Sequence, residues 1–580
     1  MALIDKASLL MVPSTYEAGK LYNVLPSGNR APDNKGGAGY DQTRADFDFD
    51  RGSNAAATRI NSSGLIEKYR ENLLLQSNNF GTTWGIQNAS VTSGQSGYDG
   101  SINAWLFSHS SSTAFLFQGK SLSASINTIS IYAKQGTSLS TRLDFVTGSF
   151  AKGASCTFDL VNGTAGSVTH YGSSSGFISG NATSVGNGWY RISLTGVTTA
   201  ETWYHELALT SGNIYIQSAQ LETGLVATDV LTSGATTAKS GVLIDLPRIN
   251  YDANGENGAL LLEPSRQQLI QFSEYFNSSY WIKGGAPTVS ITDNAGISPE
   301  GISNATRFVA ASAATSTRLY TAITWTAVPH TLSLYVKNNG GTNKDFRFSY
   351  YDGSGQYFSP TFTLTDEWQR IEYTFTPTAS SGGFWLVNTP IGGLNLDLLA
   401  YGAMLEQNAS YKSSYIPNHG TSGGVTRAAD SCSVTGASDV IGGTSGTIFF
   451  DIKTNKTLTS TNYKQFFYYS GVNSASSYMY ISGNNYIVGN PSLGNVVSGT
   501  QLEADTQYKV AITYKQNDFK LYINGSLSAT RTSGSVIDAV DITSIGSYNG
   551  VSEFNEFQFN QYAHFQEVLS DSELATLTTL

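Results

Sequence analysis

Short stretches of alternating apolar and polar residues, separated by turn residues, run along most of the chain. In residues 128–134, the apolar residues Ile129, Ile131 and Ala133 alternate with polar or amphipathic ones. Successive side chains of a strand point to opposite faces, so this period of two predicts a β-strand with one buried face. Turn clusters such as residues 186–188, Gly-Asn-Gly, separate these stretches. The pattern predicts an all-β protein with many short strands.

The chain contains an internal repeat. Residues 70–80 match residues 266–276 at an offset of 196, and a tryptophan, Trp84 or Trp281, follows each copy. Four further segments recur in the same order: 59–61 with 248–250, 128–134 with 331–337, 189–192 with 368–371, and 219–222 with 403–406. The offset drifts from 189 to 203 and back to 179, as loop insertions and deletions would produce. Two tandem sandwiches of the jelly-roll kind are the economical interpretation.

The last 150 residues follow a different pattern. Residues 447–452 begin a new series of strands, and residues 508–514 and 519–525 predict a hairpin around residues 515–518. Near the C-terminus, Ser570 and Glu573 have the spacing of a capping box, which predicts a short terminal helix.

Composition and charge narrow the function classes. Charged residues make up only 13% of the chain, and the net charge is −10 without any run of Lys or Arg, which argues against binding nucleic acid. Cys156 and Cys432 are far apart and predict buried free thiols rather than a disulfide or metal motif. The first residues lack a signal-peptide core, and no stretch has the roughly 20 apolar residues of a membrane span.

Several of these segments resemble motifs of tailed-phage structural proteins. The resemblance rests on residues 51–53, 57–59, 64–67 and 70–74 in one copy, and on residues 251–252 and 258–266, with Trp281, in the other. In that group the motif opens a jelly-roll similar to carbohydrate-binding modules, and a segment like residues 405–406, 415–417 and 425–430 closes it. The first copy departs from this ending, because residues 226–239 lack the Tyr-Ile-Pro step.

Residues 440–580 resemble the laminin G-like, or concanavalin A-like, lectin sandwich, through the hairpin at Asn524-Gly525 and the terminal Leu-Ser-Asp-x-Glu-Leu segment. These features divide the chain into consecutive parts. We expect an N-terminal anchoring or assembly segment (1–69), a first jelly-roll module (70–240), a connector with the repeated prelude (241–266), a second module (267–430) and a lectin-type sandwich (431–580). For residues 1 to about 50, the alternative is a strand added to the first sandwich.

The resemblance implies a virion protein made in the host cytoplasm and released by lysis. We expect a fibre- or spike-type appendage, on head or tail, that binds host cell-surface polysaccharide, contacts other virion proteins through residues 1–69, and forms a homotrimer. Membrane and nucleic acid are not expected partners. A purely architectural head- or tail-decorating protein is the alternative, and a polysaccharide depolymerase is a third.

Exposed aromatic rings flanked by polar groups are candidates for glycan binding. Tyr351 and Tyr357 flank the turn at residues 352–355, and Tyr478 and Tyr480 share a strand face opposite Met479 and Ile481. The alternative is that these rings cover sheet surfaces or fill subunit interfaces.

No cofactor is expected, but one strand is a candidate calcium site. Asp46, Asp48 and Asp50 alternate with Phe47 and Phe49, which places three carboxylates on one face. Carboxylates are the hard oxygen ligands that Ca²⁺ prefers. A half-buried strand with solvated acids is the alternative interpretation.

We expect no enzymatic activity. Glycosidases of the lectin-like fold carry carboxylates on one strand face, but Glu553 and Glu556 are three residues apart and would point to opposite faces. The six histidines are scattered, and we expect His205 and His564 to be ordinary structural residues.

Overall fold

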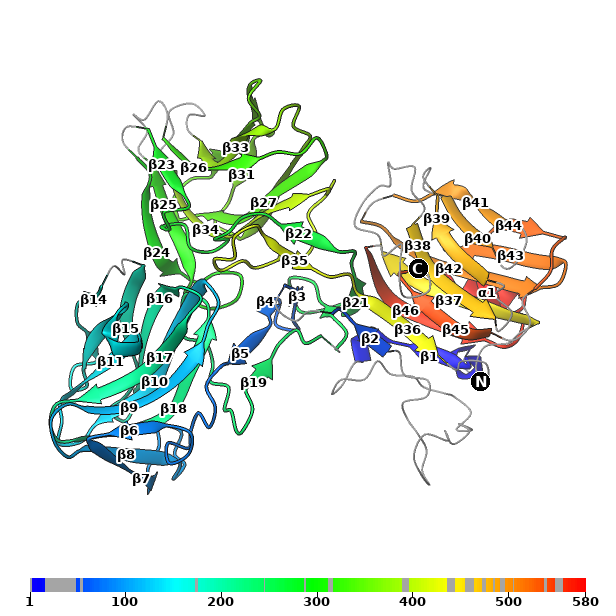
Figure 1. Ribbon diagram of the computed structural model, residues 1–580. Helices are drawn as coiled ribbons and strands as arrows, with labels where there is room; N and C mark the ends of the chain where they lie inside the picture. Colours follow the sequence, from blue (N-terminus) through cyan, green and yellow to red (C-terminus); the bar gives the residue numbers. More distant parts are fainter. Residues whose placement is uncertain are drawn as a thin grey trace. The chain divides into compact units, whose positions relative to one another are not determined.

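A computed structural model describes residues 3–15, 48–52, 56–172, 176–244, 246–285, 288–310, 317–388, 396–435, 444–453, 464–471, 476–482, 486–490, 496–503, 505–536, 540–547 and 556–580. In these residues strands predominate and the one α-helix is α1 (Asp571–Leu577), so the expected all-β fold is confirmed (Figure 1). The chain divides into two units. Unit 1 contains Met1–Lys68, Val242–Arg266 and Thr426–Leu580, and unit 2 contains Tyr69–Gly241 and Gln267–Val425.

Residues 69–241 of unit 2, here called module 1, form a sandwich of two antiparallel sheets. The strand orders are β15–β16–β10–β18–β8–β7 and β13–β12–β11–β17–β9–β6. The bounds are β6 (Gly85–Gln87), β7 (Ala89–Gln95), β8 (Ala104–His109), β9 (Ala114–Ser121), β10 (Ser125–Gln135), β11 (Ser140–Thr147), β12 (Gly153–Asp159), β13 (Thr164–Ala165), β14 (Thr169–Tyr171), β15 (Phe177–Gly186), β16 (Trp189–Thr198), β17 (Thr202–Leu209) and β18 (Asn213–Thr223). Ile129 and Ile131 from one sheet and Leu143 and Phe145 from the other share one core. This is the packing of a β-sandwich.

Residues 267–425 of unit 2, here called module 2, repeat this topology. One sheet has the order β32–β27–β34–β25–β24, and the other has the order β30–β29–β33–β26–β23. The bounds are β23 (Ile282–Gly284), β24 (Ser290–Gly296), β25 (Ala305–Ala310), β26 (Arg318–Thr324), β27 (His330–Asn338), β29 (Ser349–Tyr351), β30 (Gln356–Phe358), β32 (Gln369–Phe375), β33 (Ser381–Asn388) and β34 (Leu396–Gln407). Strand by strand, these orders match β16–β10–β18–β8–β7 and β12–β11–β17–β9–β6 of module 1. The duplication inferred from the repeated segments is therefore confirmed at the level of strand order.

The strand β10 differs from the expected pattern in one respect. Ile129, Ile131 and Ala133 are buried as predicted, but Thr128 and Ser130 on the opposite face are buried as well. The chain that follows β18 covers this second face, because the Thr128 hydroxyl donates a hydrogen bond of 2.9 Å to the carbonyl of Gly224. The expectation of a single buried face was wrong for this strand, since alternation in the sequence does not reveal a covering loop.

Unit 1 contains the lectin-type sandwich. One sheet has the order β20–β21–β46–β37–β42–β43–β44, with β1 also paired to β46, and the other has the order β2–β36–β45–β38–β39–β40–β41. The bounds are β1 (Leu9–Met11), β2 (Asp48–Asp50), β20 (Ile249–Asn250), β21 (Ala259–Leu262), β36 (Ser431–Thr435), β37 (Ser445–Lys453), β38 (Lys464–Gly471), β39 (Ser476–Ile481), β40 (Tyr486–Asn490), β41 (Val496–Gln501), β42 (Gln507–Lys515), β43 (Asp518–Ile523), β44 (Ser526–Arg531), β45 (Val540–Ile545) and β46 (Phe557–Phe565). The predicted hairpin forms between β42 and β43, and Ser570 and Glu573 make the predicted capping box of α1.

Segments distant in sequence complete this sandwich. The strand β1 pairs with one half of β46, at Tyr562–His564, while β21 pairs with the other half, at Phe557–Phe559. Leu9 and Met11 are fully buried in the core of unit 1. On the other sheet, β2 extends the edge beside β36. The structure thus differs from the expected division, in which residues 1–69 and 241–266 lay outside the C-terminal sandwich.

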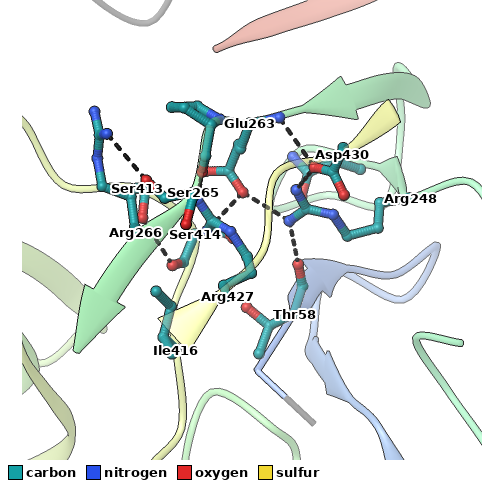
Figure 2. A network of polar contacts seen from close by, with 12 residues as sticks. Thr58, Arg248, Glu263, Ser265, Arg266, Ser413, Ser414, Ile416, Arg427 and Asp430 are labelled. Atoms are coloured by element: carbon teal, nitrogen blue, oxygen red, sulfur yellow. Dashed lines mark hydrogen bonds and ion pairs between the residues drawn. The ribbon is translucent and has the colours of Figure 1, made fainter. Parts of the chain in front are cut away.

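A buried network of ion pairs ties these segments of unit 1 together (Figure 2). The guanidinium of Arg248 binds the carboxylates of Glu263 and Asp430, and it also donates to the carbonyl of Thr58. Arg427 lies 2.8 Å from Glu263, and Arg51 lies 3.5 Å from Asp430. Burial, together with the neighbouring arginines, lowers the pKa of Arg51 to about 10, although Asp430 opposes this effect. Three cations therefore share two carboxylates away from solvent.

Candidate functional site

One line of side chains crosses the outer face of the second sheet of module 2. Backbone pairing places Trp385 of β33 beside Tyr320 of β26 on one side and beside Ser349 of β29 on the other. The line ends in Ile282 of β23 and Phe358 of β30. Phe384 and Leu386, which flank Trp385 on β33, are fully buried in the core, so Trp385 points away from it.

Aromatic rings form a continuous surface along this line. The rings of Tyr320 and Trp385 are 29° from parallel, with centroids 5.9 Å apart. Tyr351 stands edge-on to Trp385 at 6.5 Å, and the residue is 40% exposed. The guanidinium of Arg318 lies over the Tyr320 ring at 5.5 Å. We call Tyr320, Tyr351 and Trp385 the aromatic row of module 2.

The equivalent line in module 1 has different chemistry. Glu206 of β17 lies between Phe117 of β9 and Asp144 of β11. Ser155 and Gly85 continue the line on either side. The offset between Phe117 and Tyr320 is 203 and that between Glu206 and Trp385 is 179, which are offsets already found between the repeated segments. Strand order, register and sequence therefore agree on the equivalence.

The two carboxylates of this line, Asp144 and Glu206, differ in their partners. Arg142, two residues before Asp144 on the same strand face, binds its carboxylate with two hydrogen bonds of 2.7 and 2.8 Å. Burial raises the pKa of Asp144, while Arg142 opposes that rise. Burial also raises the pKa of Glu206 to about 7; Asp144 adds to the rise and Arg142 counteracts it. We call Arg142, Asp144 and Glu206 the acidic row of module 1.

Aromatic rings flank the acidic row. Phe117 lies directly beside Glu206 in the sheet, and Tyr204 meets the Phe117 ring edge-on at 6.1 Å. On the far side, the hydroxyl of Tyr171 donates a 3.3 Å hydrogen bond to Ser155. All three rings are half-buried, so their remaining surface faces solvent. The face thus combines the half-buried carboxylate of Glu206 with partly exposed rings, over the fully buried Asp144.

Of the four tyrosines expected to bind glycan, two flank the predicted turn between β29 and β30 but lie on opposite faces. Tyr351 belongs to the aromatic row. Tyr357 instead pairs with Tyr350 and stacks on its ring at 4.9 Å, and Tyr350 packs toward the core against Phe375. Tyr351 and Tyr357 therefore do not form one site.

The other two tyrosines lie on β39 of unit 1. Met479 and Ile481 are buried, as predicted for the inward face of this strand. Tyr480 is half-buried, and the side chain of Tyr478 lies outside the described residues. The binding role expected for Tyr478 and Tyr480 stays a prediction.

The three expected calcium ligands are described only in part. Asp46 lies outside the described residues, as does the side chain of Asp48. Asp50 is exposed, and its carboxylate accepts a hydrogen bond of 2.9 Å from the amide of Gly52, which caps a local turn. Among the residues the structure describes, no three His, Cys, Asp or Glu side chains are grouped as metal ligands. The calcium site stays a prediction.

The groups considered for catalysis fall in the core or outside the described residues. Glu553 is not described, and Glu556 is buried. His205 and His564 are fully buried, and burial lowers their pKa values to about 4 and about 3. The ring of His564 is hydrogen-bonded to the hydroxyl of Tyr514 at 2.9 Å. Both histidines are core residues, as expected, and Cys156 and Cys432 are buried free thiols.

Comparison with known proteins supports the fold of unit 1. Residues 437–575 match the family model of the concanavalin A-like lectin/glucanases superfamily, which confirms the resemblance inferred for residues 440–580. No curated protein matches the chain. Within the described residues, no helix is long and apolar enough to cross a bilayer.

Three solved structures illustrate what the chain is similar to. A CBM40 of Ruminococcus gnavus IT-sialidase, solved with α2,3-sialyllactose, is 21% identical over 25% of this chain and 87% of its own, with a TM-score of 0.22. The tandem CBM22-1–CBM22-2 of Paenibacillus barcinonensis Xyn10C is 8% identical over 62% and 99%, with a TM-score of 0.21. Domains LG4-5 of mouse laminin α1 are 8% identical over 44% and 88%, with a TM-score of 0.18.

Proposed function

We propose that this protein is a non-enzymatic, glycan-binding structural protein of a tailed-phage virion, of the fibre or spike type. The observation that carries glycan binding is the aromatic row of module 2, with Tyr320 and Trp385 nearly parallel and Tyr351 beside them. The virion role rests on the resemblance of residues 40 to 430 to motifs of phage structural proteins. The concanavalin A-like sandwich of unit 1 adds a second fold that hosts binding proteins.

The chemistry of the aromatic row suits a sugar ring. A pyranose has an apolar face, which an aromatic plane can cover, and a rim of hydroxyl groups that need hydrogen-bond partners. Arg318 and Gln356 supply exposed polar groups at the border of the row, opposite Gly284 and Tyr351 in the sheet. Binding would be shallow, because the row lies on an open sheet face.

A glycan array with the full-length protein tests this function. We expect binding to host-type polysaccharide fragments, and we expect Trp385→Ala to weaken it about tenfold or more, as for a central aromatic residue of an interface. Tyr357→Ala is the matched control, because Tyr357 is 39% exposed but lies on the other face of the hairpin from Tyr351. Unchanged glycan binding by a folded Trp385→Ala protein would refute the assignment of the binding site to the aromatic row. If the protein binds no glycan at all, glycan binding is refuted and the architectural role is favoured.

Location and assembly require separate experiments. Antibody labelling of purified phage particles under the electron microscope should place the protein on head or tail, and particles that lack it would refute the virion role. Light scattering should give a homotrimer at micromolar concentration. Incubation with capsule or cell-wall polysaccharide should release no reducing sugar. Turnover that Glu556→Gln abolishes would instead establish a depolymerase.

A further inference from the structure

The two modules share their strand order but differ at the centre of the same sheet face. Where module 2 has Ser349 and Trp385, module 1 has Asp144 and Glu206 at the same two positions in the line. Two carboxylates directly opposite each other on an antiparallel pair have β-carbons about 5 Å apart and destabilise the sheet by mutual repulsion. Arg142 offsets part of this repulsion, and the carboxylates still give the face of module 1 a different chemistry from that of module 2, which indicates a different ligand.

The charges of the acidic row do not cancel. The guanidinium of Arg142 is held by Asp144 through both oxygens. The carboxylate of Glu206 makes no hydrogen bond or ion pair with any described residue, and Glu206 lies half-buried beside Asp144. On the other side β9 opposes it with the ring of Phe117. When Glu206 is ionised, the face therefore has one negative charge in excess and lacks a donor for it.

The rings around this excess charge favour a cation as well. Phe117 adjoins Glu206 directly, and Tyr204 adjoins Phe117. A ligand cation over the face of an aromatic ring is attracted by the ring quadrupole, and the attraction grows when the site is partly desolvated. The half-buried Glu206 carboxylate and the ring faces together complement a compact ammonium group attached to a ring-shaped ligand.

We propose that this face of module 1 binds a sugar carrying a primary ammonium group through Glu206, while Asp144, which is fully buried and held by Arg142, adds negative charge beside it. This inference rests on the proposed glycan-binding function and names the class of sugar. The ammonium donates to the Glu206 carboxylate, and the apolar face of the sugar covers Phe117. An N-acetylated sugar lacks the charge and offers Glu206 only neutral hydrogen-bond donors, which are weaker partners for a carboxylate.

The test compares a glucosamine pentamer with an N-acetylglucosamine pentamer, both titrated into the full-length protein by calorimetry at pH 7. We expect the glucosamine pentamer to bind about tenfold more tightly or better, the order expected of one charge-assisted hydrogen bond. Glu206→Gln should abolish that preference. Equal affinity of the two pentamers for the unmodified protein would overturn the proposal.

Controls separate the site from general attraction to a chain of net charge −10. Glu367→Gln removes the same charge from an exposed position and should leave the preference unchanged. Binding of Trp385→Ala on the glycan array is a separate measurement, and it decides the function proposed for module 2. Binding of a lysine pentapeptide as tightly as the glucosamine pentamer would show that the face recognises charge alone, and it would overturn the assignment to a sugar.

Discussion

The guanidinium of Arg248 lies 2.7 Å from the carboxylate of Glu263, and both side chains are shut off from solvent. The same pair occurs in the first copy of the prelude, where Arg59 and Glu67 are 2.6 Å apart but 21% and 24% exposed. Both pairs bridge a short hairpin. The first hairpin consists of β3 (Thr58–Ile60) and β4 (Ile66–Lys68), and the second consists of β20 and β21. Duplication has thus produced one solvated and one buried version of the same contact.

We expect the two ion pairs to contribute differently to the free energy of unfolding. Glu263→Gln would remove the carboxylate that binds Arg427 and Arg248 and would leave Asp430 to Arg51 and Arg248. We expect it to lower the free energy of unfolding by about 3–5 kcal/mol. Glu67→Gln, the matched control, should cost less than about 1 kcal/mol because its pair is partly solvated. Denaturant unfolding measures both values. A Glu263→Gln protein as stable as the control would contradict a structural role for the buried network.

Much of the fold could be predicted because the repeat presents the sequence pattern of several strands twice. Residues 128–134 and 331–337 lie within β10 and β27, and both modules have the same strand order. The pairing of β1 could not be predicted, because three apolar residues carry no information about which distant sheet edge they will join. Leu9 pairs with His564, more than 550 residues away. Only the completed sandwich, with a free stretch of β46, reveals that partner.

The candidate site was less predictable for a similar reason. Phe117, Asp144 and Glu206 come from three separate strands and share no local spacing. Their adjacency follows from sheet order and register, which the sequence does not encode within any short motif. Tyr351 and Tyr357 flank one turn, which predicts a pair, but pairing across the hairpin places them on opposite faces. The repeat offset of 179 that relates Glu206 to Trp385 was the one available signal.

The N-terminal strand should contribute to the stability of the C-terminal sandwich. Leu9 is fully buried among the core residues of unit 1, so Leu9→Ala should destabilise it by about 2–4 kcal/mol through lost burial and the cavity left behind. Deletion of residues 1–15 should expose the paired half of β46 and lower the melting temperature further. Leu527→Ala, at a side chain that is 49% exposed, should change the stability by less than about 0.5 kcal/mol. Calorimetric melting that is unaffected by the deletion would contradict this role.

A β-bulge that both modules share should make glycine the preferred residue at one position of module 2. The ladder shifts between Ser130 and Tyr132 in module 1 and between Ser333 and Tyr335 in module 2. Gly402 lies in the second bulge, where it and Ala403 of β34 oppose Leu334 of β27. It has a φ of +61°, and a β-carbon there would lie 3.2 Å from the ring of Tyr415. Gly402→Ala should therefore cost about 1–3 kcal/mol, from left-handed strain and crowding. Gly148→Ala is the control, since no atom lies within 4 Å of its added carbon. Equal stability of the two variants in urea would contradict the constraint.

The acidic row should make stability depend on pH in a direction opposite to that of a paired carboxylate. Burial, assisted by Asp144 and opposed by Arg142, raises the folded-state pKa of Glu206 to about 7, whereas an unfolded glutamate titrates near about 4.3. Between these values the folded protein binds more protons at Glu206 than the unfolded chain does. Stability from this group is therefore greatest below about pH 4 and is lost as the pH rises to about 7.

Glu206→Gln removes this dependence. Relative to the unmodified protein, the variant should gain about 1–2 kcal/mol on going from pH 4 to pH 8, a value discounted for the partial exposure of Glu206. The other buried carboxyl groups cancel in this comparison because both proteins contain them. Glu367→Gln should show a nearly constant difference, since its carboxylate is exposed. Urea unfolding of the three proteins at pH 4, 6 and 8 measures the effect. The stability difference between Glu206→Gln and the unmodified protein could instead stay constant with pH. That result would show that Glu206 ionises normally in the folded state. The excess charge of the acidic row would then be solvated rather than held for a ligand.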